Sequence, residues 1–393
     1  MLQYSVYQLN IINSTLQSEK LEIPRSGAGG SGGPNRLLPP KQQQDILIAM
    51  RKGDRHANVL SELQWNTIKI YTDGAIDRPE KKQRDKGYGV WFGTSHPLNK
   101  IHPLSSSSEM RNSTLVELTA IEEALKQVIN PNYYCCQPVA IFTDSLDAVS
   151  YLSGTQDIPP NMQKKVAAIK EKMENVLGGV RFEHVKGHAY VYGNVQADNF
   201  AGAARLGNTI PDPTWKELPT STRVDMRPEE LLMVKRLQHA KDIAELDWKT
   251  IVVYIAVNKI GHQYAGWFGR DHPLNFAYNA EGKETADKLS LAVETVLGKL
   301  NGWKYYVGKP VCIVVTDQRF KEWGKDKELP KALQRDFPTR VTALTELMAG
   351  LQGDVVQFQS IHEEWEVPGW KKAHALIRSK AVRHHPDCPK VKP

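Results

Sequence analysis

The stretch that decides the fold reads NTIKIYTDG and spans residues 66–74. Ile68 and Ile70 alternate with polar neighbours, which predicts a β-strand. Asp73 and Gly74 then predict the end of that strand, although an Asp-Gly pair alone would indicate only a turn. The carboxyl ends of strands are where α/β sheets form their sites. Asp73 is therefore the first candidate site residue.

Three more acidic residues follow in comparable settings. Glu117 falls in the first turn of a helix expected over residues 114–128, whose apolar residues recur at helical spacing and whose N-cap would be Ser113 or Thr114. Asp144 ends the short apolar run 138–143, which is typical of a buried strand. Asp198 lies near the start of a further expected helix. A helix dipole or a cap would explain each residue singly.

Taken together, the four carboxylates predict a metal centre. Four such groups brought to one place would repel each other unless cations held them there. Hard oxygen ligands suit magnesium or manganese. Two such ions roughly 4 Å apart can activate a water molecule and stabilise the leaving oxygen when a phosphodiester is hydrolysed.

Residues 66–207 resemble the catalytic domain of type 1 ribonuclease H, on motifs that match in order and spacing: Tyr71-Thr72-Asp73-Gly74, Gly87-Tyr88-Gly89, Val116-Glu117-Leu118, Thr143-Asp144-Ser145, Val185-Lys186-Gly187-His188, Gly193-Asn194 and Ala197-Asp198. The resemblance implies an α/β fold in which helices flank a mixed five-stranded sheet. It also implies cleavage of the RNA strand of RNA–DNA hybrids with two magnesium ions. Asp73, Glu117, Asp144 and Asp198 would be the metal ligands, and His188 would assist proton transfer or product release.

The chain departs from the family at its nucleic-acid contacts. The family's paired asparagines, which read the RNA minor groove, are replaced here by Ser113 and Thr114. The basic handle is replaced by a plainer helix, expected over residues 162–177. Basic residues in the loop near residue 80 are either a compensating grip or a solvated hairpin loop. The candidate nucleic-acid-binding residues are thus Ser113, Thr114, Lys82, Arg84 and Lys186.

An internal repeat predicts a second domain of the same kind. The pattern Trp-Phe-Gly followed by His-Pro-Leu-Asn occurs at residues 91–99 and again at 267–275. Strand-like runs at 251–257, 311–316 and 356–361, with helical patterns at 288–300 and from about 371, follow the plan of the first copy. The expected fold is therefore two ribonuclease-H-like domains, each a mixed five-stranded sheet flanked by helices.

The second copy has lost its candidate ligands. Aligned by eye, Asp73 corresponds to Ala256, Glu117 to Leu289, Asp144 to Asp317 and Asp198 to His374, while His188 corresponds to Glu364. One ligand in four cannot assemble a two-metal site. We expect this copy to be catalytically dead and to serve partner or substrate binding, by analogy with other degenerate domains.

The organisation follows from these patterns and from the ends of the chain. Residues 26–33 are a glycine–serine tether, either engineered or natural. Residues 1–25 carry a helical apolar stripe that would suit a docking peptide from a binding partner, although the alternation of Leu2, Tyr4 and Val6 is also typical of a strand. The expected parts are 1–25 (peptide), 26–33 (tether), 34–65 (N-terminal extension), 66–207 (catalytic domain), 208–248 (linker with an amphipathic helix), 249–383 (degenerate domain) and 384–393 (basic tail).

Composition is compatible with these assignments. The chain has 393 residues and a net charge of +7, which permits nucleic-acid binding without proving it. We expect no membrane span and no secretion signal, and a nuclear or cytoplasmic location. The main hypothesis is an endonuclease acting on RNA–DNA hybrid or RNA. The alternatives are a non-catalytic tandem scaffold that binds protein or RNA, and, more weakly, a retroelement-derived nuclease.

Overall fold

The computed structural model describes residues 37–76, 85–104, 112–129, 136–187, 189–207, 218–220, 224–258, 260–280, 285–303, 308–320, 334–335, 338–351, 356–379 and 383–384. The chain separates into two units, residues 1–37 and 38–393. Several sequence predictions fall outside the described residues and stay predictions: the peptide 1–25, the tether 26–33, Lys82, Arg84, His188 and the tail from 385.

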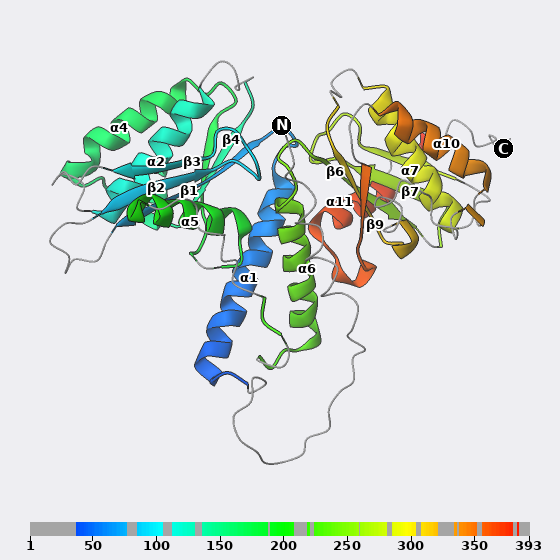
Figure 1. Cartoon of the computed structure of the whole chain (residues 1–393), viewed down its shortest axis with the longest axis horizontal. Coiled ribbons are helices and arrows are strands. Elements are labelled where there is room, and N and C mark those ends of the chain that lie inside the picture. The colour runs from blue at the N-terminus through cyan, green and yellow to red at the C-terminus, as the bar shows by residue number, and fades with distance from the viewer. Residues whose placement is uncertain are drawn as a thin grey trace, which may run out of the picture. The chain divides into compact units, whose positions relative to one another are not determined.

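The first sheet contains five strands in the order β3-β2-β1-β4-β5 (Figure 1). Its strands are β1 (Ile68–Ile76), β2 (Lys86–Trp91), β3 (Lys100–Leu104), β4 (Val139–Thr143) and β5 (Val180–His184). β1, β2 and β3 form an antiparallel meander, whereas β4 pairs in parallel with β1 and β5. Its helices are α2 (Ser113–Val128), α3 (Leu146–Ser153), α4 (Pro160–Glu174) and α5 (Tyr192–Leu206).

Two apolar layers hold the helices against this sheet. On one face, α2 and α4 pack over the sheet, and Leu118, Ile121 and Leu125 of α2 are fully buried. Burial of each such side chain stabilises the fold by roughly 1.5–3 kcal/mol. On the other face, Phe200 of α5 packs in a cluster with Tyr71 and other residues of the sheet. Both faces of the central strands are therefore covered, as the apolar run 138–143 predicts.

The second sheet repeats this strand order and adds one strand. It contains β6 (Ile251–Val257), β7 (Gln263–Trp267), β8 (Phe276–Asn279), β9 (Val311–Val315), β10 (Val356–Ser360) and β11 (Arg383–His384), in the order β10-β9-β6-β7-β8-β11. In that order, β10, β9, β6, β7 and β8 correspond to β5, β4, β1, β2 and β3 in position and direction. The two α/β sheets expected from the sequence are therefore confirmed, and the two-residue β11 extends the second one beyond β8.

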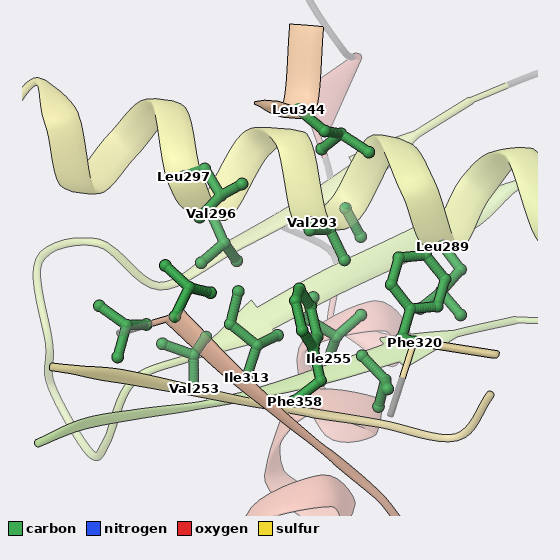
Figure 2. Close-up of a cluster of buried hydrophobic side chains, with 14 of the residues drawn as sticks. Val253, Ile255, Leu289, Val293, Val296, Leu297, Ile313, Phe320, Leu344 and Phe358 are labelled. Atoms are coloured by element: carbon green, nitrogen blue, oxygen red, sulfur yellow. The ribbon is translucent and has the colours of Figure 1, made fainter. Parts of the chain in front are cut away.

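Helices cover the second sheet as well. They are α7 (Thr285–Asn301), α10 (Pro338–Gly350) and α11 (Pro368–Arg378), with the single turns η2 (Gln318–Phe320) and η3 (Glu363–Trp365). Figure 2 shows Val293, Val296 and Leu297 of α7 facing Val253, Ile255 and Ile313 of the sheet, all fully buried. The helix predicted over 288–300 is thus the main cover of this core.

Several element boundaries differ from the sequence predictions. β1 does not end at Asp73 but continues to Ile76, because β2 pairs with it as far as Ile76↔Lys86. The N-cap of α2 is Asn112, whose side chain accepts a hydrogen bond from the Thr114 backbone N–H at 2.8 Å, and not Ser113 or Thr114. The helix expected over 162–177 is α4, which begins and ends earlier.

Each sheet is preceded by a helix that docks on it. α1 (Pro40–Glu62) lies before β1, and α6 (Pro228–Ala244) lies before β6. Their sequences share a pattern at equal spacing: a histidine, then Glu-Leu-X-Trp six residues later, at 56 and 62–65 and again at 239 and 245–248. The repeat therefore starts at these helices, so residues 34–65 and 208–248 contain matching elements.

The two copies also contact each other reciprocally within the unit 38–393. The Trp65 indole lies 4.4 Å from the His272 imidazole, and the Trp248 indole lies 4.3 Å from that of His96, between ring centroids. The Trp65 backbone N–H donates to the Arg270 backbone carbonyl at 3.0 Å, and the Trp248 backbone N–H donates to the Thr94 backbone carbonyl at 3.1 Å. This is the exchange expected at a two-fold interface, where residue i meets j and j meets i.

The Trp-Phe-Gly and His-Pro-Leu-Asn pattern builds the receiving loop in both copies. Asn99 accepts from the Phe92 N–H at 2.7 Å and donates to the Gly93 carbonyl at 2.7 Å. Asn275 does the same for Phe268 and Gly269, each at 2.8 Å. The repeated motif thus has a structural role at the contact between the copies.

No helix in the described part of the chain has the length and apolarity needed to span a membrane.

Candidate active site

Asp73 and Asp144 come together because β1 and β4 pair in parallel. The pairing ends at Thr72↔Thr143, and one carboxylate follows each partner in the chain. Asp73 remains paired with Gly89 of β2, so it lies inside β1 rather than after it. Asp144 lies just beyond β4, as the sequence predicts. Two acidic side chains are thereby set side by side at the carboxyl ends of adjacent parallel pairings.

Glu117 reaches the same place from α2. It is the fifth residue of that helix, one residue further in than the expected range 114–128 placed it, since α2 begins at Ser113. The Thr143 hydroxyl donates to Glu117 Oε2 at 3.4 Å and accepts from the Ser145 backbone N–H at 3.2 Å. A residue next to Asp144 therefore holds the Glu117 carboxylate toward the end of β4.

These three carboxylates form one cluster. Asp73, Glu117 and Asp144 each offer an oxygen within 4.8 Å of the other two, and in the described part of the chain this is the one group of three or more histidine, cysteine or acidic side chains with such spacing. Asp73 and Glu117 are each only 6% exposed, and Asp144 is partly buried. The arrangement offers a set of anionic oxygen donors directed at one point.

The electrostatics of the cluster are those expected of residues that hold a cation. Burial, with the charges of Asp144 and Asp198, raises the pKa of Asp73 well above its usual range. Burial, with the charges of Asp73 and Asp144, raises the pKa of Glu117 likewise. Hydrogen bonds from the Gly74 backbone oppose both shifts only in part. A divalent cation would relieve this repulsion, and hard oxygen donors fit magnesium or manganese.

Asp198 lies at the margin of the cluster. It is the seventh residue of α5 and not in its first turn, because that helix begins at Tyr192 and includes the Gly193-Asn194 pair. Its side chain is exposed and is not among the three carboxylates that meet within 4.8 Å. Its charge nevertheless acts on Asp73. The structure thus brings three predicted ligands together. The fourth, Asp198, lies outside this group, but its charge contributes to the raised pKa of Asp73.

The loop after β5 passes directly over Asp144. A Cβ atom on Gly187 would lie 2.7 Å from Asp144 Oδ2, so a residue with a side chain cannot occupy this position without displacing the carboxylate. Lys186, next to it, is exposed. This geometry puts a basic residue of the predicted nucleic-acid-binding set beside the cluster. His188 follows in the chain but lies outside the described residues.

The start of α2 presents only one of its two predicted contact residues. Ser113 is exposed, whereas Thr114 is 8% exposed and its backbone N–H is bound by Asn112. Sequence reasoning did not consider Asn112, which is exposed at the head of the helix. Its polar type just before the apolar helical pattern was the available signal.

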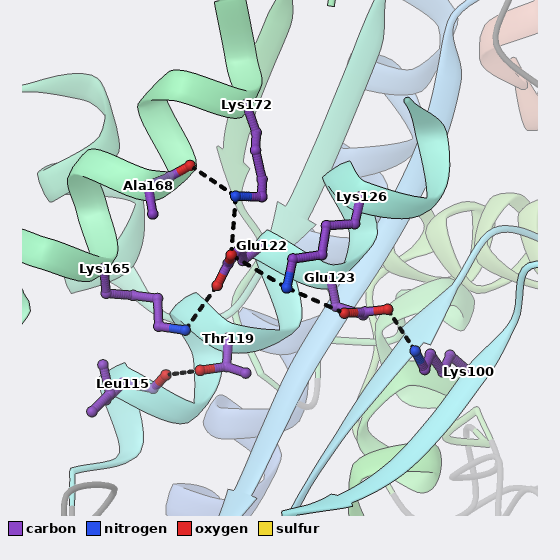
Figure 3. Close-up of polar contacts among 9 residues, drawn as sticks. All are labelled: Lys100, Leu115, Thr119, Glu122, Glu123, Lys126, Lys165, Ala168 and Lys172. Atoms are coloured by element: carbon purple, nitrogen blue, oxygen red, sulfur yellow. Dashed lines mark hydrogen bonds and ion pairs between the residues drawn. The ribbon is translucent and has the colours of Figure 1, made fainter. Parts of the chain in front are cut away.

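The lysines of α4 are partly neutralised (Figure 3). Glu122 of α2 pairs with Lys165 at 2.8 Å, with Lys172 at 3.1 Å and with Lys126 at 3.3 Å. Although burial opposes it, this contact with lysines lowers the pKa of Glu122 to about 2. Lys164 and Lys170 are exposed. Only part of the basic charge that replaces the family's handle is therefore turned outward.

The corresponding place in the second copy is apolar. Ala256 and Leu289 are 1% and 5% exposed and offer no oxygen ligand. Asp317 accepts hydrogen bonds from Arg319 Nε at 3.0 Å, which together lower its pKa even though burial acts the other way. His374 packs against Trp370, with 5.1 Å between ring centroids. The one remaining carboxylate is held by an arginine. It also stands one residue beyond the place predicted for it, because Val314 pairs with Tyr254 as Phe142 pairs with Tyr71, which makes Thr316 the counterpart of Asp144.

Sequence reasoning also missed a buried contact beneath the cluster. His56 Nε2 of α1 lies 2.8 Å from the Tyr71 hydroxyl, and its ring meets Phe142 edge-on at 4.8 Å. The signal that could have revealed it is the repeated spacing of His56 and His239 ahead of their Glu-Leu-X-Trp motifs.

Comparison with known proteins shows what this part of the chain is similar to. Residues 66–205 match the sequence profile of the RNase H family. Human ribonuclease H1 is 27% identical over 145 residues, which cover 34% of this chain and 48% of the human protein. The matched region thus spans about half of that relative. Residues 66–205 form an RNase H-like domain, in agreement with the resemblance seen in the sequence.

Solved structures include similar folds. LC11-RNase H1, isolated from compost by a metagenomic approach, is 20% identical and covers 36% of this chain and 97% of its own, with a TM-score of 0.29. RNase H1 of Halobacterium salinarum NRC-1 is 18% identical and covers 35% and 96%, with a TM-score of 0.28. A structure of LC11-RNase H1 in complex with an RNA/DNA hybrid is 19% identical over similar shares, with a TM-score of 0.29.

Proposed function

We propose that residues 66–207 hydrolyse the RNA strand of RNA–DNA hybrids at the cluster of Asp73, Glu117 and Asp144. The observation that carries this proposal is the meeting of three carboxylate oxygens within 4.8 Å, two of them on buried side chains whose pKa values are raised by burial and by neighbouring carboxylate charges. A fold has no structural use for such repulsion, whereas a divalent cation converts it into binding energy. The match to the RNase H family supports the choice of substrate.

The three clustered carboxylates, with Asp198, are the residues that would hold the metal. When bound, two magnesium or manganese ions supply an activated water and stabilise the leaving oxygen. The chain's own residues orient these donors: Thr143 fixes Glu117, and Gly187 lets the loop after β5 approach Asp144. Lys186 and Ser113 are both exposed, so that Lys186 would hold a phosphate of the strand and Ser113 would contact a 2′-hydroxyl. His188 would move a proton or release product.

We further propose that the second copy does not cut. Hydrocarbon occupies two of the four ligand positions, and the Asp317 carboxylate is engaged by Arg319. Its support to the first copy is mechanical, through the reciprocal tryptophan contacts.

One set of assays tests both statements. Labelled RNA–DNA hybrid, double-stranded RNA, double-stranded DNA and single strands are incubated with the protein and magnesium, then with chelator. We expect cleavage of the RNA strand of the hybrid alone, loss on chelation, and a fall of at least about 100-fold in Asp144→Asn. The matched variant Asp317→Asn should retain full activity. Cleavage that persists in Asp144→Asn would refute the site, and hybrid binding without cleavage by the wild type would favour the scaffold hypothesis.

A further inference from the structure

His56 contacts both residues that precede the two strand-borne carboxylates. Its Nε2 lies 2.8 Å from the hydroxyl of Tyr71, and its ring meets the ring of Phe142 at 4.8 Å and 85°. Tyr71 stands two residues before Asp73, and Phe142 two residues before Asp144. The Tyr71 and Phe142 rings stack on each other at 4.8 Å. One imidazole therefore touches β1 and β4 at two residues that pair with each other, each two positions before a carboxylate of the cluster.

This contact comes from an element outside the RNase H-like segment. His56 belongs to α1, which ends at Glu62, whereas the family match begins at residue 66. α1 is pressed against the loop that follows Gly187 as well: a Cβ atom on Gly53 would lie 2.5 Å from the Ala189 carbonyl oxygen. The same helix thus contacts the strand of Asp73, the strand before Asp144 and the loop that covers Asp144.

The chemistry of His56 suits a support rather than a ligand. Burial lowers the pKa of His56 to about 4, so its ring is uncharged at neutral pH. An uncharged ring adds no positive charge behind the carboxylates and does not compete with a cation for them. Its Nε2 is matched by the Tyr71 hydroxyl, so each of these two buried groups has a hydrogen-bond partner.

We infer that His56 is a positioning residue for the metal cluster, which it serves by fixing β1 and β4 relative to each other through Tyr71 and Phe142. This inference rests on the proposed function. Groups that hold metal ligands in place commonly change metal affinity or activity by about 10–100-fold when removed. For this more distant support we expect an effect of about tenfold.

The second copy provides a matched control within the same chain. His239 Nε2 of α6 lies 3.2 Å from the Tyr254 hydroxyl, with 5.8 Å between ring centroids. Two residues after Tyr254 stands Ala256, and the position corresponding to Phe142 is Val314, which offers no ring. The histidine–tyrosine contact therefore recurs where no carboxylate pair has to be aligned. Loss of either contact should cost similar stability, but only loss of the first should affect the metal.

The test compares His56→Phe and Tyr71→Phe with His239→Phe and Tyr254→Phe in the full chain. Both first-copy variants should weaken Mn²⁺ binding, measured calorimetrically without substrate, by about tenfold, and raise the Mg²⁺ concentration for half-maximal cleavage equally. The double variant His56→Phe/Tyr71→Phe should lose no more than either single variant, because one contact is removed. All four variants should lower the melting temperature by similar amounts.

Three outcomes are decisive. If Mn²⁺ affinity in His56→Phe equals that of the wild type while stability falls as in His239→Phe, His56 only packs and the inference is overturned. If the wild type binds Mn²⁺ and the His56 variants weaken it, but no nucleic acid is cut, the positioning role stands and the proposed hydrolysis fails. If the wild type binds no Mn²⁺ and cuts nothing, both are overturned.

Discussion

The indole of Trp65 lies against the imidazole of His272, so a residue just beyond the end of the first copy's leading helix is held by a loop of the second copy. The reverse contact joins Trp248 to His96. Two further links run between the leading helices, where Arg236 of α6 donates from Nε to Asp54 Oδ1 of α1 at 2.6 Å and from its second nitrogen to Oδ2 at 3.1 Å. The two copies are thus joined by a tryptophan–histidine contact made in both directions and by an arginine–aspartate pair between their leading helices.

The first prediction is that the tryptophan contacts couple the unfolding of the two copies. Trp65 and Trp248 are 43% and 39% exposed, so truncating either side chain costs less stability than truncating a fully buried tryptophan. We expect Trp65→Ala and Trp248→Ala each to lower the free energy of unfolding by about 1–3 kcal/mol. In urea, the wild type should unfold in one transition and the double variant in two. Leu177→Ala, at a side chain 78% exposed, is the control and should leave the midpoint unchanged. A single transition in the double variant would contradict this coupling.

The second prediction concerns pH and metal. The folded, metal-free protein holds Asp73 and Glu117 at raised pKa values, above the unfolded-chain values of about 4. The folded chain therefore binds more protons than the unfolded chain, and stability falls as pH rises through this window. Because the metal binds the deprotonated carboxylates, the gain in melting temperature on adding Mg²⁺ should be larger at about pH 8 than at about pH 5. A gain independent of pH would contradict the assignment of these carboxyls as ligands.

The variant Asp144→Asn tests the same repulsion by removing one of the charges that cause it. Removing this charge relieves repulsion on both buried carboxyls, so the metal-free protein should become more stable by about 1–3 kcal/mol. The gain from Mg²⁺ should largely disappear. Asp317→Asn is the matched control, and because Arg319 then loses its partner it should lower stability instead. Destabilisation by both changes would show that the first carboxylate is structural.

How far the sequence could predict the site depends on the range of the interactions involved. Asp73, Glu117 and Asp144 lie in short segments whose periodicity and end signals are local, and the structure brings all three together. The extent of β1 beyond Asp73 was not predictable in this way, since it depends on pairing with β2, whose sequence lies across the loop. The N-cap at Asn112 was missed because three successive polar residues could each have capped the helix.

The leading helices show the opposite limit. The importance of residues 40–62 lies in contacts with residues far along the chain: His56 with Tyr71 and Phe142, and Asp54 with Arg236. Such pairings leave no periodic signal in one sequence. The one sequence signal for these contacts is the recurrence of the histidine and of Glu-Leu-X-Trp at equal spacing. The structure explains this recurrence, because each helix docks on the sheet that follows it in the chain.

The third prediction concerns the glutamate that gathers the lysines of α4. With its pKa lowered to about 2, Glu122 stabilises the folded chain above its unfolded pKa, and this contribution is lost as pH falls from about 4 toward 2. We expect Glu122→Gln to lower the free energy of unfolding at neutral pH by about 1–3 kcal/mol, since three lysines lose a shared partner. Glu171→Gln, the same change at an exposed position of α4, should have little effect. Equal effects at neutral pH would show that the lysines gain nothing from Glu122.

The last prediction tests the loop over Asp144. A methyl group at Gly187 would approach Asp144 Oδ2 to 2.7 Å, closer than two such atoms can lie, so either the carboxylate or the loop must move. We expect Gly187→Ala to weaken Mn²⁺ binding by about tenfold while leaving the melting temperature near that of the wild type, because the loop is at the surface. The matched control is Gly202→Ala in α5, where an added methyl meets nothing within 4 Å. It should stabilise the helix by about 0.5–1 kcal/mol and leave metal binding unchanged. If Gly187→Ala binds Mn²⁺ as the wild type does, Asp144 is not restrained by this loop and the close contact has no bearing on the metal.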